Sequence, residues 1–142
     1  MTTAPSQTRT CEEVRAEAVD TGARGPKKVA LKLSVTAGIA DDRVARALPD
    51  DPVSIWEIRS SRLGASELRN QDDFSQFREL VGKTFDDIKY QHGMNVELSV
   101  FPAVPVPCAV EFGRTWQPKA HPPFLIYDQV PDRGFVLRHS VV

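Results

Sequence analysis

The sequence has few cysteines, no long hydrophobic run and almost no net charge, and each absence excludes a class of protein. Cys11 and Cys108 are the only cysteines among 142 residues, which excludes a disulfide framework and is typical of a reducing cytoplasm. No apolar run approaches the roughly 20 residues of a membrane helix, and residues 1–9 lack the apolar core of a signal peptide. With a formal net charge of −1, general attraction to duplex nucleic acid or anionic lipid is not expected.

Motifs for common catalytic and metal-dependent chemistry are also missing. There is no phosphate-binding Walker A lysine motif and no G-x-G-x-x-G fingerprint. His92, His121 and His139 lie far apart in the sequence, and no Cys-x-x-Cys pair accompanies them, so no metal site is predicted. Cys108 lies within an apolar helical turn and is expected to be a packing residue rather than a nucleophile. The sequence therefore predicts no catalytic residue, no metal and no cofactor.

The composition, 41% hydrophobic and 26% charged, is typical of a soluble globular protein with one domain. Residues 1–26 are polar, and Thr10–Glu13 resembles a capping box, which predicts a short helix over the residues that follow. A flexible arm is the alternative for this segment. We expect the folded domain to occupy residues 27–142.

From residue 29 onward, hydrophobic segments of strand length alternate with segments of helical periodicity. Strands are predicted over 29–36, 53–58, 96–101, 124–127 and 135–139, and helices over 41–48, 73–92 and 105–114. This order, β-α-β-α-β-α-β-β, predicts an α/β, Rossmann-like fold. Its mostly parallel sheet would be flanked by helices and would end in an antiparallel hairpin.

The stretch Val96–Arg114 is the most site-like part of the sequence. We expect its strand to break at Pro102, because proline lacks an N–H, and a short helix to begin at Pro105. The free N–H groups at the start of that helix would then face the carboxyl end of the strand. In open α/β sheets this is where ligands, phosphates in particular, are held.

Polar or backbone-exposing residues follow three predicted strands, at Ser34–Gly38, Ser60–Arg62 and Phe101–Pro105. The carboxyl ends of parallel strands meet at one edge, which would offer hydroxyl groups, guanidinium groups and a helix N-terminus to a phosphodiester. Phe101, Trp56 or Trp116 could stack on a base. The alternatives are that the arginines are solvated surface charges and that Trp56 belongs to the core.

Several segments together resemble the SAVED domain. They are Phe101-Pro-Ala-Val-Pro105, Cys108-Ala-Val-Glu-Phe-Gly-Arg114 and Phe124-Leu-Ile-Tyr-Asp128, preceded by a long helix with Phe77 and the segment 88–92. SAVED domains are sensors of cyclic oligonucleotides in bacterial anti-phage signalling, both CBASS and type III CRISPR systems. They are built from two CARF-type, Rossmann-like units. The resemblance implies a cyclic tri- or tetranucleotide as ligand.

The resemblance also implies which residues line the pocket and which partners act with the chain. Residues that match the motif are Phe101, Pro102, Ala103, Pro105 and Arg114, while the strand-end argument alone adds Thr36, Gly38, Ser60, Ser61 and Arg62. The chain resembles chiefly the second CARF-like unit, so the expected partner is another copy or a companion SAVED or effector subunit. Two alternatives stay open: a ring nuclease that cleaves the cyclic ligand without a metal, and a scaffold subunit that binds no ligand.

Overall fold

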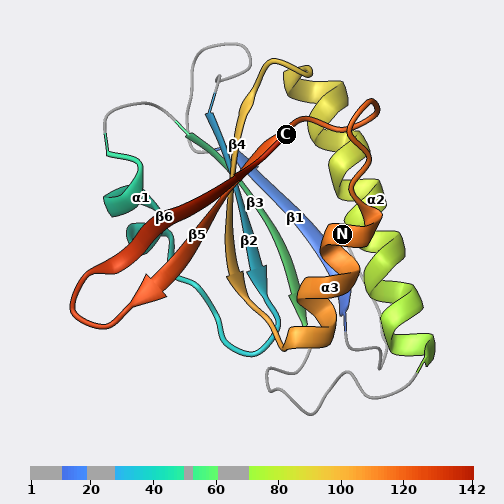
Figure 1. Ribbon diagram of the computed structural model, residues 1–142, viewed down its shortest axis with the longest axis horizontal. Helices are drawn as coiled ribbons and strands as arrows, with labels where there is room; N and C mark the ends of the chain where they lie inside the picture. The colour runs from blue at the N-terminus through green and yellow to red at the C-terminus, as the bar shows by residue number, and fades with distance from the viewer. Residues whose placement is uncertain (1–10, 19–27, 50–52, 61–70) are drawn as a thin grey trace.

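A computed structural model describes residues 11–18, 28–49, 53–60 and 71–142. The described residues form one six-stranded sheet, in the order β1-β3-β2-β4-β5-β6, and three helices (Figure 1). The strands are β1 (Cys11–Ala18), β2 (Lys28–Ser34), β3 (Val53–Ser60), β4 (Glu97–Ala103), β5 (Phe124–Val130) and β6 (Gly134–Val141), and the helices are α1 (Asp41–Ala47), α2 (Gln71–His92) and α3 (Val106–Thr115).

The four central strands are parallel, and each outer strand is antiparallel to its neighbour. The predicted α/β fold, with a mostly parallel sheet and a C-terminal hairpin, is therefore confirmed. Strand β2 lies at the centre and is buried from Val29 to Ser34, as expected for a parallel strand covered on both faces. Gly93, with φ of 87°, follows the last residue of α2, so the predicted end of this helix is also confirmed.

The helices cover both faces of the sheet. Helices α2 and α3 lie on one face, and α1 lies on the other beside the β5–β6 hairpin (Figure 1). Successive residues of the strands point to opposite faces of the sheet and contribute to two hydrophobic cores. One packs Leu31 and Leu33 against Phe85 of α2, and the other packs Ile55 against Val44 of α1. No helix among the described residues has the length and hydrophobicity needed to cross a membrane.

The helix predicted near the N-terminus is wrong, because Cys11–Ala18 is strand β1. It pairs antiparallel with β3, from Cys11 opposite Ser60 to Ala18 opposite Ser54. The backbone groups along that side of β3 need hydrogen-bond partners, and a strand supplies them where a helix cannot. The alternation of charged and apolar residues from Glu13 to Ala18 fits this period of two. The remainder of the predicted arm, residues 1–10 and 19–26, lies outside the described residues.

Pro102 does not end its strand, contrary to prediction, since β4 continues through it to Ala103. Along β4, Pro102 is opposite Leu33 of β2 and Ala103 is opposite Ser34. The pairing between β4 and β5 stops at Val100, so position 102 has no β5 partner to which it could donate. A proline is tolerated in this otherwise central strand because its missing N–H removes no bond of that ladder.

Candidate functional site

The sheet has a topological switch point between β2 and β4. These neighbouring parallel strands end at the same edge, but the chain leaves β2 for α1 on one face and leaves β4 for α3 on the other. The N–H groups of Val35 and Thr36 both donate to the carbonyl of Ala103, at 3.0 and 2.8 Å. The ends of the two strands are thus joined at the position where open α/β sheets bind ligands.

Four of the residues predicted to bind ligand lie at or directly after these two strand ends. Thr36, half-buried, and Gly38, exposed, belong to the loop that follows β2, while Ala103 and Pro105, both half-buried, end β4 and precede α3. Gly38 has no positive φ, and a Cβ placed there would meet no atom of the described part of the chain within 4 Å. With respect to these residues, its backbone is open to close approach by another molecule.

The N-terminus of α3 offers fewer free donors than predicted. Pro105 is the N-cap residue, and Pro107 in the first turn has no N–H. The N–H groups of Cys108 and Ala109 both donate to the carbonyl of Pro105, at 3.0 and 3.1 Å. This helix end therefore contributes less to anion binding than a first turn with its usual unpaired N–H groups.

Phe101 and Trp56 are core residues and do not present a ring to the strand-end edge. Phe101 is fully buried, stacks on Tyr127 at 4.7 Å between ring centroids and meets Phe135 edge-on at 5.1 Å. Trp56 is also buried, with its ring edge-on to His92. The prediction that either ring is placed to stack on a base does not fit this packing, while the alternative that Trp56 belongs to the core does.

The predicted residues Arg114 and Trp116 lie at the far end of α3, away from the strand-end edge. Those predicted after β3 lie mostly outside the described residues. Arg114 is exposed, 3.6 Å from Glu111, and about 12 Å along α3 from its first residue. It therefore does not join the strand-end residues. Trp116, at the end of the same helix, donates from its indole N–H to the carbonyl of Pro122. Ser60 is the last residue of β3, and Ser61 and Arg62 lie outside the described residues.

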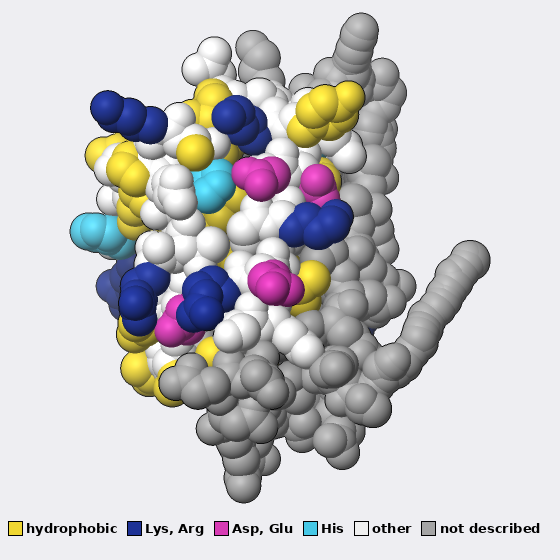
Figure 2. Space-filling model, turned by 90° about the vertical axis from the view of Figure 1, so that its right-hand side faces the viewer, with side chains coloured by type: hydrophobic (Ala, Val, Ile, Leu, Met, Phe, Trp, Pro, Cys, Tyr) yellow, Lys and Arg dark blue, Asp and Glu magenta, His cyan; other side chains and the backbone are white. Residues whose placement is uncertain are grey.

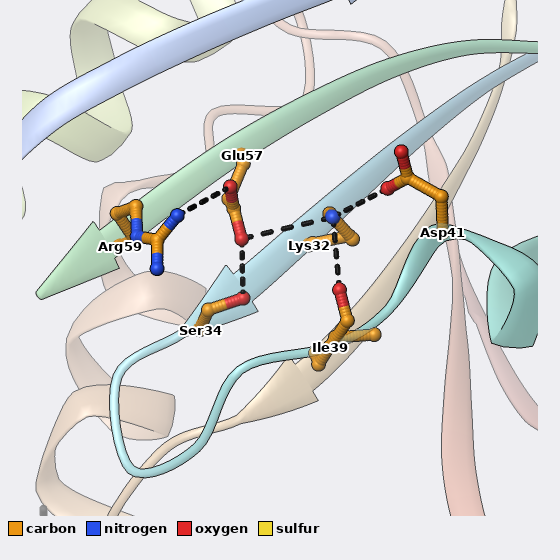
Figure 3. A network of polar contacts seen from close by, with 6 residues as sticks. All are labelled: Lys32, Ser34, Ile39, Asp41, Glu57 and Arg59. Carbon is orange, nitrogen blue, oxygen red and sulfur yellow. Dashed lines mark hydrogen bonds and ion pairs between the residues drawn. The ribbon is translucent and has the colours of Figure 1, made fainter. Parts of the chain in front are cut away.

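A buried lysine that was not predicted from the sequence lies beneath this edge. Lys32 of β2 is only 7% exposed, and its ammonium group donates to the carbonyl of Ile39 at 2.9 Å and to Oδ1 of Asp41 at 2.6 Å. Its Nζ also lies 3.7 Å from Oε2 of Glu57 (Figure 3). Lys32 thereby ties the loop after β2, and the first residue of α1, to the sheet.

Glu57 of β3 is the second acidic partner in the same network. It accepts a hydrogen bond from the hydroxyl of Ser34 at 2.8 Å, and its Oε1 lies 3.7 Å from Nη1 of Arg59 (Figure 3). The two acidic and two basic side chains of this cluster balance one another, as buried charges require. Arg59, half-buried at the end of β3, is the member closest to solvent on that strand. The sequence indicated this network only through a lysine and a glutamate within two strands whose other residues are mostly apolar.

Cys108 and His121 have structural surroundings rather than catalytic ones. Cys108 is fully buried, which together with the charge of Glu111 raises the pKa of its thiol to about 12. His121 is buried against Phe85, accepts at Nδ1 from the N–H of Gln117 at 3.0 Å and lies 3.4 Å from Asp86. Among the described residues, no group of three or more histidine, cysteine or acidic side chains could hold a metal.

The chain is similar to three solved structures of one receptor from Acinetobacter baumannii, each described as a Cap4 SAVED/CARF-domain containing receptor. The structure with the cyclic trinucleotide 2'3'3'-cAAA has a TM-score of 0.63 and 12% identity, over 95% of this chain and 28% of that chain. The structure with 3'3'3'-cAAA has a TM-score of 0.60 and 10% identity, over 93% and 28%. A third structure, whose title gives no ligand, has a TM-score of 0.60 and 11% identity, over 93% and 26%.

These similarities show the fold, and the chain spans little more than a quarter of each of those receptors. No curated protein matches the sequence. The family model described as "SMODS-associated and fused to various effectors sensor domain", SAVED, matches residues 3–136. The resemblance identified from the motif is confirmed, and the chain belongs to the SAVED family of sensor domains.

Proposed function

We propose that this chain is a cytoplasmic sensor of a cyclic oligonucleotide in anti-phage defence. The ligand binds at the edge where β2 and β4 end, against the loop of Thr36 and Gly38 and the segment from Ala103 to Pro105. The observation that carries the proposal is the switch point, where the strand ends are joined through the Ala103 carbonyl while α1 and α3 leave on opposite faces. Membership of a sensor family and the cyclic trinucleotides named for two similar structures support this ligand class.

The proposal is a binding function without catalysis. The amine nearest this edge among the described residues of β2, that of Lys32, is buried and already bonded to a carbonyl and a carboxylate. It is therefore held for structure rather than placed to act on a bound phosphodiester. Signalling proceeds through a change in assembly, with another copy of the chain or with a companion SAVED or effector subunit supplying the rest of the pocket.

Calorimetric titration with a panel of cyclic di-, tri- and tetranucleotides tests the ligand class. We expect heat of binding with a tri- or tetranucleotide, a shift in molar mass by light scattering, and no linear product after incubation. The proposal is contradicted if no member of the panel binds, either to the chain alone or in the presence of its natural assembly partner. Linear products would show a ring nuclease instead.

Gly38→Ala tests the location of the site. The added methyl group meets no atom of the described residues within 4 Å, so the fold is expected to stay intact while the ligand loses its close approach to the backbone. Gly113→Ala on α3 is the matched control, because a Cβ there also meets nothing within 4 Å where the chain is described. Weaker binding by Gly38→Ala alone supports the site, and equal affinity for both variants contradicts it.

A further inference from the structure

A cavity of about 450 Å³ opens between α1 and the turn that joins β5 to β6, on the α1 side of the sheet. Three arginines line it, Arg43 and Arg46 from α1 and Arg133 from the turn. Its remaining lining residues are Ala47 and the hairpin residues 129–132, 134 and 135. None of the residues proposed to bind the cyclic oligonucleotide is among them. We call this cavity the arginine pocket.

The arginine pocket carries an excess of positive charge. Asp132 is the one acidic residue among its lining residues, so two positive charges are left uncompensated in a chain whose net charge is −1. Within the described ranges, no carboxylate forms an ion pair with Arg43, Arg46 or Arg133. The described part of the face formed by α2 and α3 differs, because basic and acidic side chains are interspersed on it (Figure 2).

The pocket is also partly organised before any ligand enters. The guanidinium of Arg43 lies 4.9 Å from the centroid of the Phe135 ring, and Phe135 is itself buried against Phe101. The turn is tight, since Asp132 and Gly134 have φ of 70° and 76° and the N–H of Arg133 donates to the carbonyl of Val130 at 3.0 Å. Arg43 and Arg133 are therefore presented from two fixed elements that face each other.

We propose that the arginine pocket binds the phosphate groups of a small anionic ligand. A guanidinium presents paired N–H donors that match a phosphate bidentately, and three of them suit more than one phosphate charge. The volume lies within the range of about 300–1,000 Å³ for small-molecule sites, so the pocket accommodates a nucleotide-sized ligand. This site goes beyond the proposed sensing of a cyclic oligonucleotide and does not require it.

Titration of the whole chain with pyrophosphate, followed by ¹H–¹⁵N NMR, tests the proposal. We expect saturable shifts confined to residues 43–47 and 129–135, with an affinity that falls as salt is added. Arg46→Gln combined with Arg133→Gln should weaken binding by about tenfold or more for each guanidinium lost. Both side chains are exposed, so the fold should be retained. The control, Lys89→Gln combined with Lys119→Gln, removes the same charge from exposed positions elsewhere and should bind as the wild type does.

Three results would overturn the proposal: no saturable shift in the wild type at millimolar pyrophosphate, equal weakening in the control variant, or tighter binding of a glutamate-rich peptide than of pyrophosphate. A parallel titration with the cyclic oligonucleotide separates the two sites. If pyrophosphate binds and no cyclic oligonucleotide does, the proposed function fails and the arginine pocket stands. The reverse pattern refutes the arginine pocket alone.

Discussion

Lys32→Met is the substitution with the most informative expected effect. Methionine keeps the length and apolar stem of lysine but removes the ammonium, which is bonded to the Ile39 carbonyl and to Asp41 and lies 3.7 Å from Glu57. The loss of stability depends on how far water can replace the ammonium group at each of its former partners. The Asp41 side chain is 51% exposed and regains water, whereas that of Glu57 is 11% exposed and is left with two partners, the Ser34 hydroxyl and the more distant Arg59.

Removing one partner of a buried ion pair usually costs about 3–5 kcal/mol, and the exposure of Asp41 reduces this here to about 2–4 kcal/mol. Urea denaturation should show this decrease in the free energy of unfolding, and the melting temperature should fall by roughly 10 °C. Lys119→Met, at an exposed position, is the control and should leave stability unchanged.

A second substitution separates the charge effect from a packing effect. Adding Glu57→Gln to Lys32→Met removes the buried charge left behind and keeps an oxygen that can accept from Ser34. The double variant should regain about 1–2 kcal/mol relative to Lys32→Met. The reasoning is refuted if Lys32→Met costs less than about 0.5 kcal/mol, or if the double variant is no more stable than the single one.

Three other measurements test separate features of the fold. In a Cys11→Ser background, Cys108 should react with a thiol reagent at pH 8 only as fast as the protein unfolds, because burial and a pKa of about 12 keep it as an enclosed thiol; rapid labelling without denaturant would contradict this. Gly134→Ala should cost about 1 kcal/mol by urea denaturation, since φ of 76° is unfavourable for residues with a Cβ. Pro102→Ala should change stability little, because β4 has no ladder partner on β5 beyond Val100; a large loss would show that the proline itself fixes this strand end.

Much of the sheet could be predicted because its signals are local. Each central strand is a short run rich in Val, Leu or Ile, and the intervening helices have their own apolar period, so parallel pairing followed from the order of the elements. Strand β1 carried a weaker local signal. Its place depends on pairing with β3, more than 30 residues further along the chain, and the capping pattern near Thr10 favoured a helix.

The sequence predicted that Thr36, Gly38 and Ala103 lie at one edge of the sheet, because the carboxyl ends of parallel strands share an edge, and the structure places them there. Their role in binding a ligand stays a prediction. The suggestion that the Phe101 ring stacks on a base does not fit the structure, because this ring faces Tyr127 and Phe135 within the core on the α1 face. Which face a side chain occupies depends on register, and a strand covered on both faces shows no alternation from which to read it.

Lys32 shows why the supporting network was harder to predict than the edge that it supports. Its hydrogen-bond acceptors lie seven and nine residues further along the chain, at Ile39 and Asp41, and the Ser34–Glu57 bond spans 23 residues between neighbouring strands. No short motif encodes such a set. A buried lysine is tolerated only where several acceptors converge, so its presence in an apolar strand indicates that distant partners meet there. Here they meet beneath the loop of Thr36 and Gly38, and the stability of that loop should follow the network more closely than any contact within the loop.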